Sequence, residues 1–118
     1  MTISFDPISY TNLSTWTAND NQSAAQTNTV LVAAPGAGLS LYVTDLIVSN
    51  SATAGTVKLV EDTTGSATTK VPLLYFDINS GMSKKFAVPI KLTANKNLGY
   101  TSATVTTHSI YVGGFIAP

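Results

Sequence analysis

The sequence predicts an all-β fold, an antiparallel and jelly-roll-like β-sandwich of seven to eight strands with an extended N-terminal arm. Thr, Ser and Asn make up 38 of the 118 residues. Thr and Val suit the pleated surface of a strand, whereas Asn, Ser and Gly suit turns. Residues that favour helices are few, with one Glu, two Gln and no Arg, and no window carries an apolar stripe of helical period. Short apolar runs recur instead at about ten-residue spacing, as in sandwiches and barrels.

Residues 1–28 are polar and weakly patterned, so they are predicted to form an arm ahead of a sandwich domain at residues 29–118. A short strand within the arm would supply the eighth strand of a jelly roll. The arm also holds large apolar side chains whose spacing is too irregular for a core element. A large aromatic group left in water would lose a substantial contact, so these side chains are expected to anchor the arm on another surface. They are Phe5, Tyr10, Leu13 and Trp16.

Seven strand-like runs follow the arm, separated by breaks rich in Gly, Asn, Ser and Pro. They cover residues 29–34, 39–49, 56–61, 70–78, 83–92, 98–106 and 109–116. In the run at 83–92 the apolar side chains alternate most cleanly, and one buried face is expected to hold Phe86, Val88, Ile90 and Leu92. In the last run, Ile110 and Val112 are predicted to face opposite to Tyr111 and Phe115.

Proline and two-sided hydrophobicity give two further expectations about individual strands. Pro72 and Pro89 have no amide hydrogen to donate, so their strands are expected at a sheet edge or at a bulge. The run at 39–49 is apolar on both faces, which indicates either a central strand beneath the arm or a subunit interface. The candidate interface residues on this run are Tyr42, Leu46 and Val48.

Charge and cysteine content argue against several classes of function. Lys and Arg total six, Asp and Glu total six, and charged residues are only 10% of the chain, so nucleic acids and anionic membranes are not expected partners. The absence of Cys excludes disulfides, thiolate catalysis and Cys-ligated metals. No secretory signal is apparent at the start, and no stretch is apolar enough to span a membrane, so the protein is expected to be made in a cytoplasm and used as made.

Catalytic and metal-binding patterns are weak, and the protein is expected to be neither an enzyme nor a cofactor carrier. His108 stands between two strands, as a surface or turn residue often does, and no Gly-x-Ser-x-Gly turn accompanies it. Glu61 and Asp62, with Asp45 and Asp77 elsewhere, could supply oxygen ligands to Ca²⁺, but no calcium-loop spacing is present. Adjacent acids at a strand end are more typical of a solvated turn.

Two surface features have alternative interpretations. The pair Lys84-Lys85 is a small basic spot, better explained as charge that protects a strand edge than as a nucleic-acid site. The tyrosines and Trp16 could form a sugar-stacking platform, although their spread over different elements favours interface or core positions. These tyrosines are Tyr10, Tyr42, Tyr75, Tyr100 and Tyr111.

Two sequence signatures resemble a known group of proteins. The first is Leu31-Val32-Ala33-Ala34-Pro35-Gly36-Ala37-Gly38, followed by an apolar strand and Leu46-Ile47-Val48-Ser49-Asn50. The second runs from Pro89 to Leu98 and reads PIKLTANKNL, and the chain closes with Tyr111-Val112-Gly113-Gly114-Phe115. In this order they resemble the small β-sandwich structural proteins of tailed bacteriophages, over about residues 29–117. A basic residue often follows the Pro-Gly-x-Gly turn in those proteins, and here Leu39 takes its place.

The resemblance implies a virion structural protein, specifically a decoration or cement protein that binds across subunit junctions of the assembled head. Its partners would be the major capsid protein or other virion proteins, together with further copies of itself, with a trimer as the expected homo-oligomer. A tail or fibre component and a carbohydrate-binding module are the alternatives. Binding of this kind exists only when neighbouring subunits are in place, so it would stabilise the assembled shell by mass action.

Overall fold

The computed structural model describes residues 14–118, and every regular element in that range is a β-strand. There are eight strands: β1 Ser14–Gln22, β2 Thr29–Val32, β3 Ser40–Asn50, β4 Gly55–Glu61, β5 Thr68–Phe76, β6 Ser80–Lys91, β7 Leu98–Ala103 and β8 His108–Ala117. The seven runs predicted from residue 29 onward all form strands. The all-β prediction and the count of seven to eight strands are therefore confirmed.

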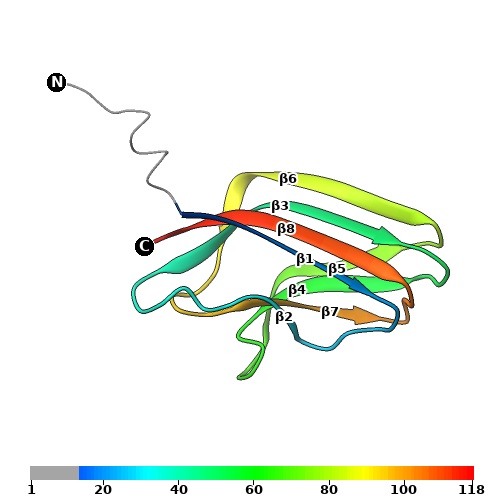
Figure 1. Ribbon diagram of the computed structural model, residues 1–118, viewed down its shortest axis with the longest axis horizontal. Helices are drawn as coiled ribbons and strands as arrows, with labels where there is room; N and C mark the ends of the chain where they lie inside the picture. Colours follow the sequence, from blue (N-terminus) through cyan, green and yellow to red (C-terminus); the bar gives the residue numbers. More distant parts are fainter. Residues whose placement is uncertain (1–13) are drawn as a thin grey trace.

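The strands form two four-stranded antiparallel sheets that pack face to face (Figure 1). Sheet A has the order β1-β8-β3-β6 and sheet B the order β2-β7-β4-β5. The pairs β1–β8, β2–β7, β3–β6 and β4–β5 are all hydrogen-bonded neighbours. The chain is thus arranged as one long hairpin, with β1–β4 against β5–β8, rolled into two sheets. This nesting is the topology of a jelly roll, as predicted.

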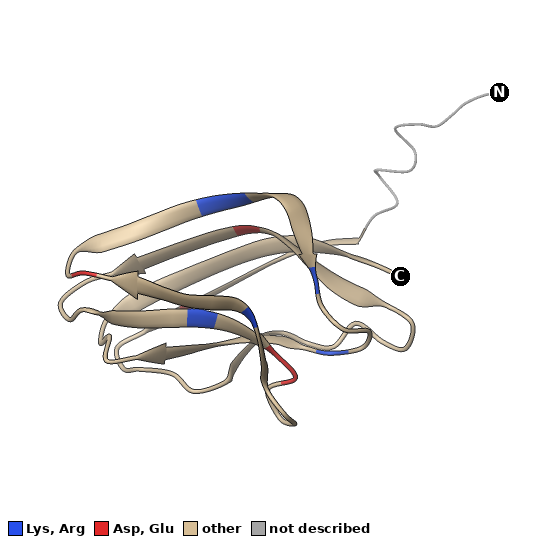
Figure 2. Ribbon diagram, turned by 180° about the vertical axis from the view of Figure 1, so that it is seen from behind, with Lys and Arg blue, Asp and Glu red and all other residues tan. Residues whose placement is uncertain are grey.

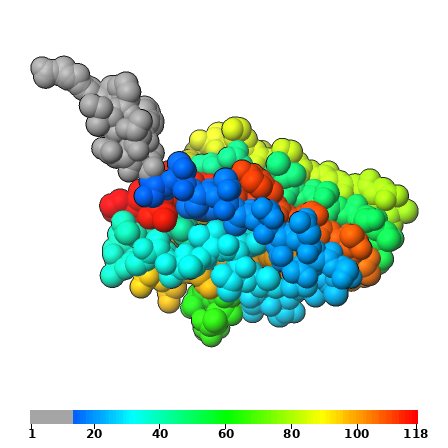
Figure 3. Space-filling view, in the orientation of Figure 1, coloured from blue at the N-terminus to red at the C-terminus, as the bar shows by residue number. Residues whose placement is uncertain are grey.

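Strand β1 belongs to the sandwich although it lies within the segment 1–28 that the sequence suggests is an arm. All nine of its residues pair with β8, from Ser14 opposite Ile116 to Gln22 opposite His108. In the space-filling view β1 and the segment after it lie along the surface beside β8 (Figure 3). The polar composition of β1 follows from its position, because an edge strand with one solvated face needs few apolar side chains. The sandwich therefore begins no later than Ser14.

The core lies between the two sheets and is built from aliphatic side chains around one aromatic residue. Tyr100 on β7 is the largest fully buried side chain, and Leu41, Leu59, Leu98 and Ile110 pack in the same cluster. The Tyr100 hydroxyl donates a hydrogen bond of 2.7 Å to Oδ2 of Asp20 on β1. This bond links sheet B to the edge of sheet A.

A bulge in β3 explains why this strand is apolar on both sequence faces. Its register against β6 and β8 shifts between Val43 and Asp45, so the side chains before and after the shift reach the same interior. Leu41 and Val43 before it, and Leu46 and Val48 after it, are all fully buried in the core. Leu46 and Val48 consequently pack inside the sandwich, and the expectation that they contact a neighbouring subunit is corrected.

Both prolines lie where a missing ladder donor is tolerated. Pro72 is on β5 and Pro89 on β6, the edge strands of sheets B and A, and the register is irregular beside each of them. Near Pro89, four residues of β6 (86–89) lie opposite the single residue Thr44 of β3. This insertion falls between the paired residues Ile90–Val43 and Lys85–Asp45. Val88 is 81% exposed as a result, so the buried face predicted for it is wrong.

Candidate interaction surfaces

His108 is a structural residue at the start of β8, where the sequence suggests a surface or turn position. Its ring is buried, and its Nδ1 lies 2.7 Å from the Thr106 carbonyl oxygen. A carbonyl only accepts, so Nδ1 carries the hydrogen, and in the neutral ring Nε2 accepts from Ser102 Oγ at 3.0 Å. Ser102 Oγ in turn accepts from the Gln26 amide at 2.8 Å. The imidazole thus joins β8 and β7 to the segment after β1.

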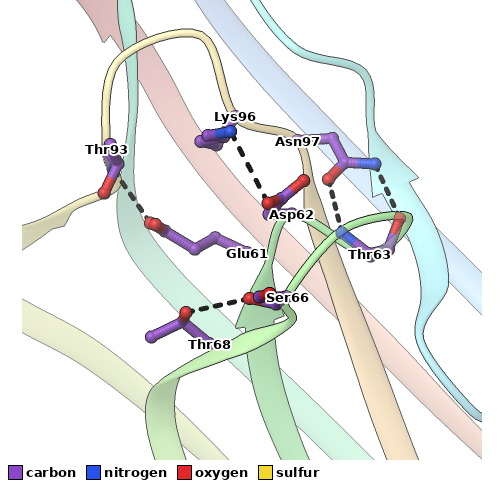
Figure 4. A network of polar contacts seen from close by, with 8 residues as sticks. All are labelled: Glu61, Asp62, Thr63, Ser66, Thr68, Thr93, Lys96 and Asn97. Atoms are coloured by element: carbon purple, nitrogen blue, oxygen red, sulfur yellow. Dashed lines mark hydrogen bonds and ion pairs between the residues drawn. The ribbon is translucent and has the colours of Figure 1, made fainter.

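Glu61 and Asp62, considered above as calcium ligands, act as ties between loops (Figure 4). The buried carboxylate of Glu61 accepts from the Thr93 amide at 2.8 Å and lies 3.5 Å from Lys70 Nζ. Burial acts to raise the pKa of Glu61, but the hydrogen bonds from Thr93 and the charge of Lys70 outweigh it, and the pKa lies below its usual value of 4.5. Asp62 pairs with Lys96 at 3.5 Å. Within residues 14–118, no three His, Asp or Glu side chains come close enough together to hold a metal ion.

The two sequence signatures meet at one junction of three loops. Asn95 donates its amide to the Leu39 carbonyl at 2.7 Å, and its side-chain oxygen accepts from the Gly36 amide at 3.0 Å. Asn95 has φ of 57° and Gly36 has φ of 115°, backbone conformations that suit Asn and Gly respectively.

The third loop joins through Asn97, whose side chain accepts from the Thr63 amide and donates to the Thr63 hydroxyl, at 2.9 and 2.8 Å (Figure 4). Leu92 within the second signature and Leu98 at its end are buried in the core. These signature residues therefore have a structural role in closing one end of the sandwich.

The outer face of sheet A carries a row of aromatic side chains near the start of β1. Tyr42 on β3 and Phe115 on β8 stack with ring centroids 4.7 Å apart and an interplanar angle of 8°. Lys91 on β6, opposite Tyr42 in the ladder, places Nζ 5.6 Å from the same ring. Ile47 and Tyr111 are paired further along the same two strands, and Ile47 is 46% exposed. We call these five residues the sheet A face.

The Tyr42–Phe115 end of the sheet A face lies beside the point where the described chain begins. Phe115 is paired with Thr15 on β1 and with Tyr42 on β3, so all three stand in one row across the sheet. Trp16 points the other way and packs against the core next to Gly114. A Cβ at Gly114 would clash with the Tyr42 carbonyl oxygen and with the Trp16 ring, so glycine is required there.

The candidate anchors and interface residues are thus only partly brought together. Tyr42 lies on the sheet A face, whereas Trp16 is a half-buried residue against the core. Phe5, Tyr10 and Leu13 lie outside the described residues. Ile47 and Phe115 were not among the candidate interface residues, and the signal for Phe115 was its alternation with Ile110 and Val112 in the last strand.

The second apolar surface is the end of edge strand β5. Tyr75 is 79% exposed and Leu73 46% exposed, and both point away from the core, while Leu74 packs against the core and Phe76 is buried. Ile78 follows with 53% exposure. An open hollow of about 420 Å³ lies beside Tyr75 and Phe76.

Charge is distributed unequally over the edge strands (Figure 2). β6 carries Lys84, Lys85 and Lys91 together with a bulge, devices that protect an edge from pairing. The segment Leu73–Phe76 carries no charge. Among the described residues, β5 pairs with β4 alone.

Comparisons with known proteins give no relative of this chain. No protein-family model, no curated protein and no solved structure matches it. Residues 14–118 also contain no helix long and apolar enough to cross a membrane.

Proposed function

We propose that this protein is a structural component of a tailed-phage virion, a decoration protein that binds across subunit junctions of the assembled head. The sheet A face and the chain before Ser14 make the contact. The observation that carries the proposal is the Tyr42–Phe115 stack on the outer face of sheet A, in the same row as the start of β1. Jelly-roll sandwiches are common in viral capsid domains, and the sequence signatures point to the same class.

The chemistry of the sheet A face suits a contact held by apolar area. Four of its five residues are uncharged, and Lys91 is held against the Tyr42 ring. The charges between its two aromatic positions, Asp45 and Lys85, pair with each other at 3.4 Å. Salt screens interactions between exposed charges but has little effect on apolar burial. Binding to shells should therefore change little between low and high salt.

A carbohydrate platform at Tyr42 is not supported by the ring geometry. Sugars stack on an exposed aromatic face, and one face of Tyr42 is covered by Phe115 while Lys91 lies over the ring as well. The sequence resemblance fits a head protein and a tail or fibre component alike, and imaging of the particle distinguishes the two.

The test is co-sedimentation of the protein with empty shells assembled from the capsid protein of the same genome. Deletion of residues 2–12 leaves β1 intact, whereas deletion of residues 1–28 would remove an edge strand and the Asp20–Tyr100 bond. Deletion of residues 2–12 and the substitution Phe115→Ala should each abolish or greatly weaken saturable binding. Val30→Ala, at an exposed position on β2 of sheet B, is the matched control and should bind as the parent does.

Thermal unfolding of each variant shows whether it remains folded. The proposal would be contradicted if the 2–12 deletion and Phe115→Ala variants were both folded and both bound shells as tightly as the parent.

A further inference from the structure

The free edge of β5 has the properties of a pairing surface. Leu73–Phe76 is uncharged, ends next to exposed Ile78, and presents the backbone groups that face away from β4. Natural edge strands are normally protected by charge, proline or bulges. β6 has all three of these devices. On β5 they lie at the start of the strand, as Lys70, Pro72 and a bulge in which Pro72 and Leu73 together oppose Lys58, so that Leu74–Phe76 is the part in regular register with β4.

We propose that Leu73–Phe76 pairs with the same segment of a second copy, in antiparallel orientation about a two-fold axis at Leu74. The two copies of sheet B then form one continuous eight-stranded sheet. This pairing closes at two copies, in place of the trimer expected from the resemblance. It is independent of the proposed shell binding, which uses the outer face of the other sheet.

The side-chain pattern supports this register. Leu73 and Tyr75 both point to the outer face of sheet B, and Leu74 points to the core. With Leu74 opposite its own copy, Leu73 of each chain lies opposite Tyr75 of the other on the outer face. Aromatic and aliphatic residues directly opposite each other are favourable cross-strand pairs. Two such pairs form at once, because a two-fold contact uses the same patch on both copies.

The charges at the two ends of the segment favour a second copy as the occupant. Asp77 directly follows the apolar segment, whereas Lys70 before it is already paired with Glu61 of its own chain at 3.5 Å. In the antiparallel register Asp77 of one copy lies near the Lys70–Glu61 pair of the other and far from the other Asp77. A parallel arrangement would place the two Asp77 side chains together. The chain has no net charge, so two copies do not repel each other at long range.

The first test is sedimentation velocity over a range of protein concentrations. The parent should show a concentration-dependent dimer. Tyr75→Lys should raise the dimer dissociation constant by at least about tenfold, because like charges then approach each other across the pair. Val30→Lys is the matched control, since Val30 is an exposed apolar residue on β2 at the opposite edge of the same sheet, and its dimer should persist.

The second test reads the register directly. Leu73→Cys and Tyr75→Cys chains, mixed under mild oxidation, should cross-link to each other faster than Tyr75→Cys chains cross-link among themselves. Amide hydrogen exchange in residues 73–76 should also slow as concentration rises. A parent that is monomeric at every concentration, a trimer, or a dimer that Tyr75→Lys leaves intact would overturn the pairing. A glycan that binds at Tyr75 while the parent stays monomeric would do so too, and would assign this edge to carbohydrate recognition.

Discussion

Replacing Tyr100 by Phe isolates the hydrogen bond that connects the two sheets. The ring of Tyr100 is fully buried, and its hydroxyl donates to Asp20 at 2.7 Å. The substitution keeps the ring packing and removes one bond to a charged acceptor, which is worth about 1.5–3 kcal/mol. Asp20 still accepts a hydrogen bond of 2.9 Å from the side-chain amide of Gln22 in the variant. The loss of stability is therefore expected in the lower half of that range. The free energy of unfolding should fall by about 1.5–2 kcal/mol, or about 6–8 °C in Tm.

The measurement is urea unfolding of Tyr100→Phe, Asp20→Asn and the double variant. A direct bond predicts that the two single losses do not add, with a coupling energy of about 1 kcal/mol or more. A loss below about 0.5 kcal/mol for Tyr100→Phe, or strict additivity, would refute the reasoning.

The same bond predicts an alkaline pH dependence. Burial raises the pKa of Tyr100, and the hydrogen bond to Asp20 and the charge of Asp20 raise it further above the usual 10.0. The neutral hydroxyl is therefore favoured in the folded state. Its contribution to stability is fully present below about pH 10 and is lost as the pH rises toward the folded-state pKa. The parent should lose stability above pH 10 more steeply than Tyr100→Phe does.

Three further substitutions test the loop junction and the bulge in β3. The pKa of Glu61 is lowered in the folded protein, so its stabilising effect is present above about pH 4.5 and is lost as the pH falls through the lower folded-state value. Glu61→Gln should cost about 1 kcal/mol at pH 7 and flatten the stability profile between pH 3 and 6, and equal slopes in urea titrations of parent and variant would contradict this. Leu46→Ala should cost about 2–5 kcal/mol and Ile47→Ala less than about 1 kcal/mol, because the bulge turns Leu46 inward and leaves Ile47 on the surface. Equal costs in thermal unfolding would contradict that assignment.

The strands after residue 29 could be predicted because each is a short apolar run between turn-forming residues. The proline argument also located edge strands correctly, since a missing donor at Pro72 or Pro89 excludes a central position. β1 was harder to recognise. An edge strand with one solvated face contains few apolar residues, and the Asn, Asp and Gln residues between Ala18 and Gln22 resemble a linker.

Bulges account for the errors in side-chain direction. Alternation assumes a constant period of two, and one extra residue reverses the face of every side chain beyond it. The register shift between Val43 and Asp45 gave β3 buried apolar residues at both alternating sets of positions, although these all face one core. The insertion at residues 86–89 likewise turned Val88 to the surface. His108 was misplaced for a different reason. Its burial depends on Ser102 and Gln26, which the fold brings to it from other elements.

The sheet A face could not be read from the sequence as one site. Tyr42, Phe115 and Ile47 come from two strands far apart in the chain, and only the β3–β8 register places them together. The exposed end of β5 was visible as an apolar run, but its lack of a second strand partner depends on the strand order, which the sequence does not specify.

Difference imaging of the virion, assembled with and without this protein, tests the proposed role most directly. We expect density to disappear from the outside of the head, at positions repeated by the symmetry of the shell and lying over the junctions between capsid subunits. Heads that look identical in both preparations, with the protein recovered only in the unassembled fraction, would contradict the proposed function.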